Sequence, residues 1–282
     1  MTKLELYEKT SFANSETITR LYSTSFATAI KLLAPRMRTP IHGIYGFVRF
    51  ADEIVDTFHQ TNQGAVLAAF KTATFEAIEN QFSINPVLHA FQVIVNRYGI
   101  DHQLIHSFFK SMEMDLYKKT YESYEEYSSY IYGSAEVVGL MCLPILCDNN
   151  HEQVNALKDA AKSLGAAFQK INFLRDVQED FKDLNRVYFP NIDFNNLDDY
   201  QKKQLLLDID KDFQAGLAGI KLLPIGSRFG VYVAYRYYRS LFDKIDRLPA
   251  RVILQKRVRV PDFKKLLIIF DSYFRFQLNT NL

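Results

Sequence analysis

Residues 164–190, LGAAFQKINFLRDVQEDFKDLNRVYFP, carry polar side chains at regular steps within an otherwise apolar sequence. As a helix, this stretch places those side chains on one face: Gly165, Gln169, Asn172, Asp176 and Asp180. The rest of the circumference is mostly apolar, which is the inverse of the wide polar arc of a surface helix. We therefore expect a buried helix whose polar stripe lines an internal cavity.

The polar stripe ends in two aspartates whose spacing favours the binding of a cation. Asp176 and Asp180 are four residues apart, so their Cβ atoms lie about 5 to 6 Å apart on a helix and their charges repel. Mg²⁺ takes one or two protein carboxylates and keeps water and phosphate oxygens in its other positions. Asn172 can add a carbonyl oxygen, and Arg175 presents a fork for phosphate oxygens. The alternative is a solvated acidic helix end.

A second stretch repeats the arrangement. Residues 40–60, PIHGIYGFVRFADEIVDTFHQ, start with a proline that a first helical turn accepts. The same spacing places one polar stripe on this helix, formed by Tyr45, Arg49, Asp52 and Asp56. If the two helices face each other, they hold Mg²⁺ between two acidic walls, and the arginines supply positive charge for a diphosphate.

Composition bounds the fold class. The chain has 282 residues, of which 48% are hydrophobic, so it can bury one large core, and nothing demands a second domain over 1–282. Only 11 Gly and 8 Pro separate long periodic segments, and no alternating strands with hairpin turns occur. We expect an all-α protein. A net charge of +2 gives no reason to propose nucleic acid as a partner.

The two ends of the sequence bear on localisation. The N-terminal MTKLELYEKTSF has charges where a signal peptide needs an apolar centre, and no run of 18 uncharged residues occurs. We therefore expect a cytoplasmic protein. The segment RLPARVILQKRVRVPDFKKL from residue 247 is distinctly basic. It fits a solvated helix end, and it also fits peripheral contact with an anionic lipid surface.

Several motifs together resemble the squalene/phytoene synthases. They are DEIVD at 52–56 with Arg49 ahead of it, QKINFLRDVQED at 169–180 and NRVYFP at 185–190. Within this family, MDL at 114–116 and YIYGSAEVVGL at 130–140 look most like the bacterial phytoene synthases. The resemblance covers residues 20–265 and rests on the joint spacing of the two acidic motifs.

The resemblance implies a fold and a site. The fold is a single-domain helical bundle of the class I isoprenoid synthase type around a central cavity. The implied ions are about two or three Mg²⁺, with Mn²⁺ as a substitute, held by Asp52, Asp56, Asn172, Asp176 and Asp180. The implied catalytic residues are Tyr45, Arg49, Tyr132, Arg175 and Tyr188. The implied substrate-binding residues are Ser23, Ser25, Phe26, Val137, Gln169, Asn172, Arg186 and Arg257.

Two positions have a second interpretation. The hydroxyl-rich STSF at 23–26 is also a natural helix break or cap, since Ser and Thr side chains compete for backbone hydrogen bonds. Glu136 departs from the family, in which a small residue is more frequent, so its carboxylate must turn away from the cavity or pair with a cation.

The implied reaction joins isoprenoid diphosphates. Two geranylgeranyl diphosphates condense head to head through a cyclopropyl diphosphate, and loss of a proton gives phytoene. One alternative is a squalene or dehydrosqualene synthase that uses farnesyl diphosphate, because tunnel depth rather than the acidic motifs sets chain length. A second alternative is a non-catalytic helical assembly factor of the same family, although all four aspartates are intact here. The sequence leaves NADPH use and the oligomeric state open.

Overall fold

The computed structural model describes residues 1–182, 186–190, 192, 194 and 196–277; the side chains of 179–182 and 262 lie outside this description. These residues form α-helices and one π-helical turn, and within them the only β feature is an isolated bridge between Thr120 and Val187. The first helices are α1 (Lys3–Tyr22), α2 (Thr24–Lys31), α3 (Pro35–Asp56), α4 (Gln63–Asn80), α5 (Pro86–Tyr98) and α6 (His102–Tyr117). The others are α7 (Tyr124–Ile131), η1 (Tyr132–Glu136), α8 (Val137–Leu146), α9 (His151–Lys182), α10 (Asp199–Leu222), α11 (Ile225–Arg247), α12 (Ala250–Ile253) and α13 (Asp262–Gln277).

Two hydrophobic clusters organise these helices. The first joins α1 to α6 and part of α8, and at its centre Phe47 stacks on Phe91 with ring centroids 3.7 Å apart. The second joins α7 to α12, where Phe173 stacks on Tyr188 at 3.8 Å. Helix α8 contributes side chains to both clusters, including Met141 to the first and Leu143 to the second. The expectation of an all-α fold is confirmed.

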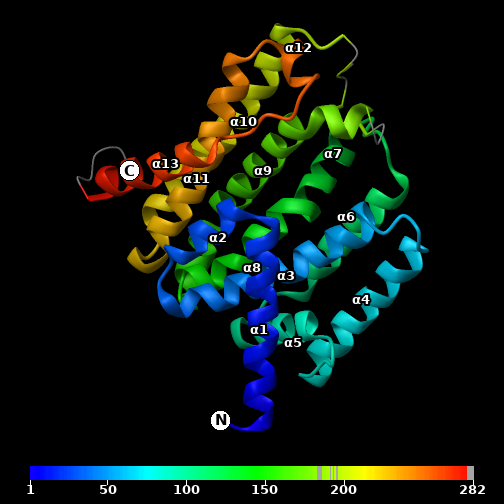
Figure 1. Ribbon diagram of the computed structural model, residues 1–282, viewed down its shortest axis with the longest axis vertical. Helices are drawn as coiled ribbons and strands as arrows, with labels where there is room; N and C mark the ends of the chain where they lie inside the picture. Colours follow the sequence, from blue (N-terminus) through cyan, green and yellow to red (C-terminus); the bar gives the residue numbers. More distant parts are fainter. Residues whose placement is uncertain (183–185, 191, 193, 195, 278–282) are drawn as a thin grey trace.

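Helix α9 runs through the middle of the bundle (Figure 1) and packs against α10, α8 and η1. The buried ammonium of Lys170 ties it to α10 through Asp208 at 2.6 Å and Asp212 at 2.8 Å. On the side of η1, a Cβ atom on Gly165 would lie 2.7 Å from the carbonyl oxygen of Ala135, so only glycine permits this approach. The central helix is therefore held closely on two sides.

The helix boundaries correct two expectations. Pro40 does not begin a helix: α3 starts at Pro35, and Pro40 lies inside it. The stretch at 164–190 is not one helix either, because α9 begins earlier, at His151, and ends at Lys182. The break at the hydroxyl cluster is confirmed, since the side chain of Ser23 accepts the N–H of Phe26 at the start of α2.

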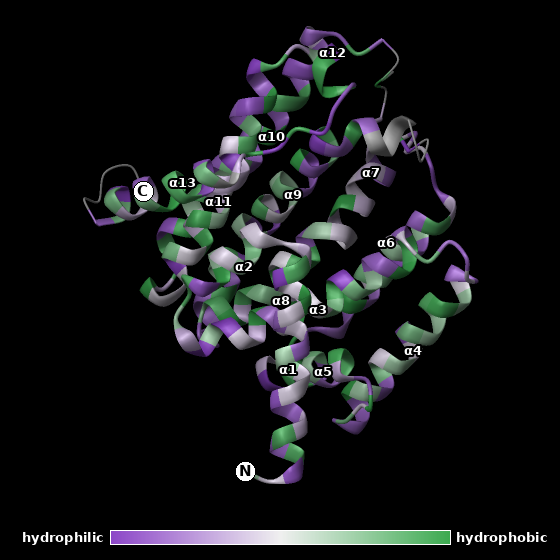
Figure 2. Cartoon of the chain, in the orientation of Figure 1, coloured by the Kyte–Doolittle hydropathy of each residue, from purple (hydrophilic) through white to green (hydrophobic). Residues whose placement is uncertain are grey.

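Hydropathy varies along the bundle in the way burial requires. Figure 2 shows hydrophobic colours concentrated on the inner helices such as α8, while α1 alternates between polar and apolar residues. Among the described helical stretches, Tyr124–Leu146 is long and apolar enough to cross a membrane, and half of its most apolar window is buried inside the protein. A core helix satisfies the same criteria, and several residues of this stretch line the cavity described below.

Candidate active site

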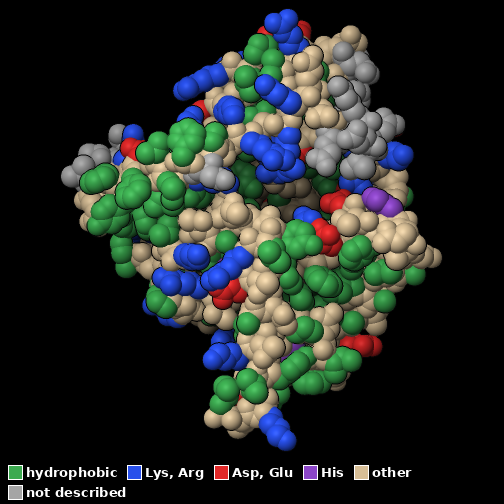
Figure 3. Space-filling model, viewed as in Figure 1, with side chains coloured by type: hydrophobic (Ala, Val, Ile, Leu, Met, Phe, Trp, Pro, Cys, Tyr) green, Lys and Arg blue, Asp and Glu red, His purple; other side chains and the backbone are tan. Residues whose placement is uncertain are grey.

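A cavity of about 940 Å³ lies between the two clusters. Figure 3 shows a hollow near the middle of the viewed face, with Lys and Arg side chains on one rim and Asp and Glu on the other. Charged side chains from α3, α9 and the segment around Arg257 line the cavity, and Arg257 pairs there with Asp176 of α9. Small and aliphatic side chains from α2, α8, α10 and α11 line the remainder. The cavity thus has the two parts that an amphiphilic ligand with an anionic head requires.

Helix α3 supplies one acidic wall. Asp52 and Asp56 both line the cavity, one helical turn apart. Burial, followed by the charge of Asp56, raises the pKa of Asp52 to about 8, although 32% of its side chain remains exposed. Arg49 lies 3.9 Å from Asp52 and forms a closer ion pair with Glu53. The wall is short of positive charge in this state, which favours a cation between its carboxylates.

Helix α9 supplies the opposite wall. Asp176 is bound by two arginines: Nε of Arg175 donates to it at 2.9 Å, and Nε of Arg257 lies 2.8 Å from the same oxygen. The side-chain amide oxygen (Oδ1) of Asn172 is buried in the cavity without a hydrogen-bond partner. An orphaned acceptor next to carboxylates is what a hard cation with oxygen ligands would satisfy.

The residues present fit Mg²⁺ as far as they are described. Asp52, Asp56, Asp176 and Asn172 offer only oxygen atoms to the same cavity, which is the donor set Mg²⁺ prefers. Asp180 was predicted to complete the second wall, and its side chain lies outside the described residues. Within the described part of the chain no three Asp, Glu, His or Cys side chains are close enough to form a metal site by themselves.

Arg186 bridges to a carboxylate that sequence reasoning missed. Its guanidinium donates to Asp56 at 3.2 Å and to the backbone oxygen of Asp115 at 2.9 Å. The side chain of Asp115 accepts the hydroxyl of Tyr130 at 2.7 Å. Burial raises the pKa of Asp115 to about 7, against the opposing effect of Arg186. An arginine, a carboxyl and a phenol therefore form one connected group at the cavity wall.

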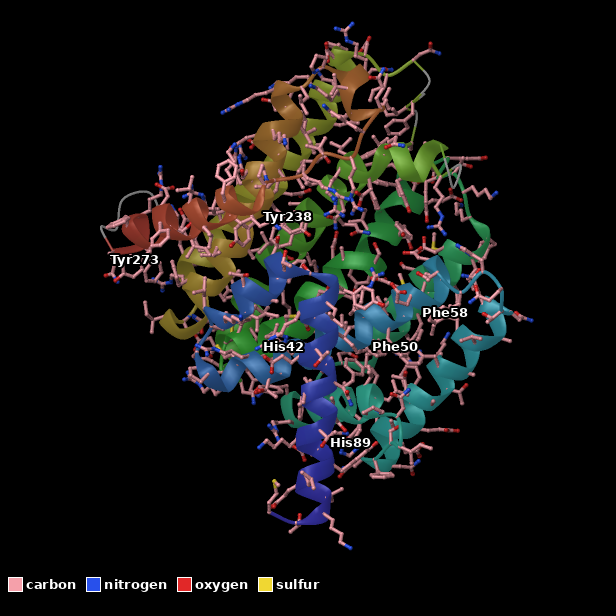
Figure 4. The ribbon with its side chains drawn as sticks, viewed as in Figure 1. His42, Phe50, Phe58, His89, Tyr238 and Tyr273 are labelled. Carbon is pink, nitrogen blue, oxygen red and sulfur yellow. The ribbon has the colours of Figure 1, made fainter. Side chains whose placement is uncertain are left out.

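Aromatic side chains from α2, α3, α9 and α11 pack against one another at the cavity wall. Phe26 on α2 lies 5.9 Å from Tyr45 and 5.8 Å from Tyr238, measured between ring centroids. Tyr238 stacks on Phe168 of α9 at 3.9 Å, and Figure 4 places it near α2 and α9 at the centre of the bundle. Burial raises the pKa of Tyr45 to about 12, so its phenol stays protonated at neutral pH.

Most of the predicted site residues meet at this cavity. Its lining includes Ser23, Phe26, Tyr45, Arg49, Asp52, Asp56, Gln169, Asn172, Arg175, Asp176, Arg186, Tyr188 and Arg257. Among the described lining residues, three predicted ones are absent: Ser25, Tyr132 and Val137. Tyr132 and Val137 belong instead to the first hydrophobic cluster, where Val137 is fully buried. Glu136 also lies off the cavity, and Lys162 and Lys170 partly offset the rise that burial causes in its pKa.

The lining residues that were not predicted include Tyr130, Asp115 and Tyr238, and the first two had a signal in the sequence. Tyr130, Ser134 and Val138 lie at steps of four, and all three line the cavity, so helical spacing favours Tyr130 over its neighbour two residues on. Asp115 lies at helical spacing from the buried Phe108 and Met112 of α6, and a carboxylate on such an apolar face is unusual enough to indicate a function. Tyr238 had no signal, because α11 contains several tyrosines of similar context.

A sequence profile described as squalene/phytoene synthase matches residues 19–264. The chain belongs to this family. As a squalene/phytoene synthase it is similar to the chloroplastic phytoene synthase 2 of tomato, Solanum lycopersicum, with 29% identity over 90% of this chain and 87% of that protein. It is also 28% identical to a 15-cis-phytoene synthase of Synechocystis, over 93% of this chain and 84% of that enzyme. The predicted family and the enzyme class of prenyltransferase are confirmed.

Solved structures support the fold of this squalene/phytoene synthase. A dehydrosqualene synthase in complex with a ligand superposes with a TM-score of 0.81 at 21% identity, over 96% of this chain and 98% of that one. The squalene synthase HpnC of Alicyclobacillus acidocaldarius gives 0.75 at 18% identity, over 86% and 95%. The predicted helical isoprenoid synthase fold is thereby confirmed.

Proposed function

We propose that this enzyme condenses two geranylgeranyl diphosphates head to head to phytoene, through a cyclopropyl diphosphate, with Mg²⁺ as its cofactor. The observation that carries the proposal is one cavity lined by carboxylates and arginines of α3 and α9 together with many aliphatic side chains. The relatives named phytoene synthase, at 28% to 29% identity over most of the chain, support the C20 substrate.

The charged part of the cavity suits a diphosphate. Arg175, Arg186 and Arg257 converge on it and are held by Asp176 and Asp56. Guanidinium groups bind phosphate oxygens through the same paired N–H donors that now bind carboxylates. We infer that an arriving diphosphate replaces these carboxylates as the arginines' partner, and that the carboxylates become available for metal.

Asp52, Asp56, Asn172 and Asp176, with Asp180 one turn further along α9, would hold the Mg²⁺ ions. When bound, Mg²⁺ supplies Lewis-acid stabilisation of the departing diphosphate. The arginines add fixed positive charge at the same oxygens, which stabilises the leaving group as it develops charge. These four metal-binding aspartates have no acid or base role in this proposal.

The apolar part of the cavity protects the allylic cation that remains. Ile30, Leu33, Ile44 and Leu164 present only hydrocarbon to it, so water that would convert the cation to an alcohol is excluded. The close approach of α8 to α9 depends on Gly139, at which a Cβ would lie 2.8 Å from the carbonyl oxygen of Ala161. Small residues at this contact leave the polyprenyl chain its space.

The last step requires loss of one proton. The stoichiometry is two diphosphate esters in, and one hydrocarbon, two diphosphate ions and two protons out, with no change of redox state. One proton leaves carbon when the cyclopropyl diphosphate forms, and the other leaves in this last step. We propose that the phenol of Tyr130 relays this proton toward Asp115, to which it is already hydrogen-bonded at 2.7 Å. The raised pKa of Asp115, about 7, suits a carboxylate that must accept a proton near neutral pH.

Squalene or dehydrosqualene formation from farnesyl diphosphate is the second candidate. The fold likeness to a dehydrosqualene synthase, with a TM-score of 0.81 at 21% identity, favours it. Squalene formation also consumes hydride from NADPH, whereas the phytoene and dehydrosqualene reactions do not.

Product analysis separates the candidates. Purified protein with Mg²⁺ is incubated with labelled farnesyl or geranylgeranyl diphosphate, with and without NADPH, and the extracted hydrocarbon is identified by mass. The proposal expects a C40 hydrocarbon with a central conjugated triene from geranylgeranyl diphosphate without NADPH. No C40 product from the C20 substrate, together with a C30 product from the C15 substrate, would overturn it.

A further inference from the structure

Helix α13 has one face packed against the bundle and one face in solvent. On the inner face, Ile268 and Ser272 are buried, and Ile268 joins Val233 and Tyr237 of α11 in a small hydrophobic cluster. Phe276 follows on the same face and contacts Phe229 of α11, with ring centroids 5.2 Å apart. These contacts fix how the helix is rotated, and they determine which side chains point outward.

The outer face is formed by bulky apolar side chains that remain 58% to 65% exposed. We call them the docking face: Phe263, Leu266, Leu267, Phe270 and Phe274. Their spacing of three, one, three and four residues is that of a single stripe on a helix. Figure 3 shows hydrophobic side chains gathered over α13, and Figure 4 places Tyr273 at the outer end of this helix. An apolar stripe of this size in solvent marks an interaction surface.

The surroundings of the docking face are strongly basic. Residues 247–277 contain eight Lys or Arg and two Asp, a net charge of +6, whereas the whole chain carries only +2. Of the two aspartates, Asp271 is engaged by Arg236 at 2.6 Å and by Arg275 at 2.8 Å. Lys256 and Lys264 are exposed near the start of α13. A binding partner that complements this face therefore has an apolar surface that also carries negative charge.

The first turn of α13 lies beside a segment that lines the cavity. Nζ of Lys265 is 3.1 Å from the hydroxyl of Thr24. Ser23, which precedes Thr24 in the sequence, lines the cavity. Arg257, five residues before α13 begins, lines it as well. A surface that binds the docking face is thereby placed within reach of the cavity.

We propose that the docking face binds an anionic lipid bilayer, with α13 lying in the headgroup region and its five apolar side chains inserted. A second copy of this chain fits the surface less well, because a two-fold contact would bring two segments of charge +6 together. The inference goes beyond the proposed reaction and does not depend on it, since binding is measured without substrate.

The test is cosedimentation of the full chain with vesicles of phosphatidylcholine alone or mixed with phosphatidylglycerol. We expect partitioning onto the anionic vesicles to exceed that onto neutral ones about tenfold, and to fall as salt is raised. The double variant Phe270→Ser/Phe274→Ser should lose about tenfold of this binding. Leu6→Ser/Ile84→Ser, which removes two exposed apolar side chains from α1 and the α4–α5 connection, should bind like the unaltered chain.

A second pair of variants tests the charge and is independent of the apolar substitutions. Lys256→Gln/Lys264→Gln should weaken binding to the anionic vesicles about tenfold, whereas Lys3→Gln/Lys9→Gln, on α1, should leave it unchanged. Equal binding to neutral and anionic vesicles, or no binding to either, would overturn the proposal. So would a dimer of the unaltered chain, seen by sedimentation, that Phe270→Ser/Phe274→Ser dissociates without any effect on vesicle binding.

Discussion

At the scale of single residues, the aspartates of the cavity differ in how many arginines they pair with. Asp176 has two guanidinium partners and Asp56 has one, whereas Asp52 is 3.9 Å from Arg49, which binds Glu53 more closely. Burial, followed by the charge of Asp56, raises the pKa of Asp52 to about 8, and Arg49 offsets only part of this rise. Removal of its charge should therefore relieve repulsion within the wall while removing a metal ligand.

Asp52→Asn should lower kcat at least about a hundredfold, because one carboxylate ligand is lost from the Mg²⁺ site. Its free energy of unfolding without Mg²⁺ should stay the same or rise, since repulsion with Asp56 decreases. Steady-state turnover and urea unfolding measure the two quantities. Asp159→Asn, at an aspartate 97% exposed on α9, is the control. Full Mg²⁺-dependent activity of Asp52→Asn would contradict the metal role.

Asp115→Asn should change how stability depends on pH. The carboxyl pKa is about 7 in the folded protein and about 3.9 in the unfolded chain. Both states are protonated below about pH 4, and as pH rises toward about 7 the unfolded state releases its proton first, so the folded state loses stability. The variant lacks this loss and should be more stable than the unaltered protein by at least about 1 kcal/mol at pH 8. Urea unfolding at pH 5 and 8 without Mg²⁺ checks this, and a difference that does not grow with pH would contradict it.

Tyr130 and Tyr132 provide a matched pair. Tyr130→Phe removes the hydroxyl that donates to Asp115 and should lower kcat at least about tenfold, since a proton relay is lost. Tyr132→Phe should have little effect, because its ring packs in the first cluster and not at the cavity. Product formation under saturating substrate measures both. Equal losses in the two variants would count against the relay.

Spacing predicted the cavity residues that sit on uninterrupted helix. Tyr45, Arg49, Asp52 and Asp56 were placed on one face of α3, and all four line the cavity. Tyr132 was chosen by likeness to a motif and not by periodicity, and it lies off the cavity, whereas Tyr130, two residues earlier, lines it. Asp115 was missed because its partners, Tyr130 and Arg186, are 15 and 71 residues away in sequence.

At the scale of elements, the contact of α9 with η1 and α8 sets the width of the cavity. The π-helical turn at Tyr132–Glu136 adds one residue to a helical turn, and it packs directly against α9. Gly165 of α9 and Gly139 of α8 face backbone carbonyl groups across this contact. Small changes there would move whole helices, because backbone atoms cannot rotate away as a side chain can.

Gly165→Ala should destabilise the protein by about 1 to 3 kcal/mol, since the added methyl would lie 2.7 Å from the carbonyl oxygen of Ala135. Gly64→Ala is the matched control within α4, where the nearest atom lies 3.6 Å away, and it should stabilise the helix by about 0.5 to 1 kcal/mol. Thermal unfolding of both variants gives the comparison. A stabilised Gly165→Ala would mean that the helices are not in close contact.

The sequence predicted that these elements are helices, but it misplaced some of their first and last residues. The break between α1 and α2 followed from the hydroxyl cluster, and the structure confirms it through the cap formed by Ser23. Pro40 gave a false start for α3, because a proline inside a helix is tolerated where the surrounding packing holds the helix together. Local signals identify helices, whereas tertiary packing sets their boundaries.

At the scale of the whole molecule, the cavity exists because two hydrophobic clusters meet along α8 without merging. The chain brings α3, from the first cluster, opposite α9, from the second. Sequence predicted that these helices should face each other, but the depth of the space between them depends on side chains from several other helices. Chain-length specificity was therefore beyond prediction from motifs.

The account depends on carboxylates of two distant helices binding the same metal ions. Mn²⁺ binding in the presence of pyrophosphate, followed by electron paramagnetic resonance, tests this most directly. We predict about two or three bound Mn²⁺ ions in the unaltered protein, and a weakened site when either Asp56→Asn on α3 or Asp176→Asn on α9 is introduced. Unchanged Mn²⁺ affinity and stoichiometry in both variants would contradict a shared metal centre.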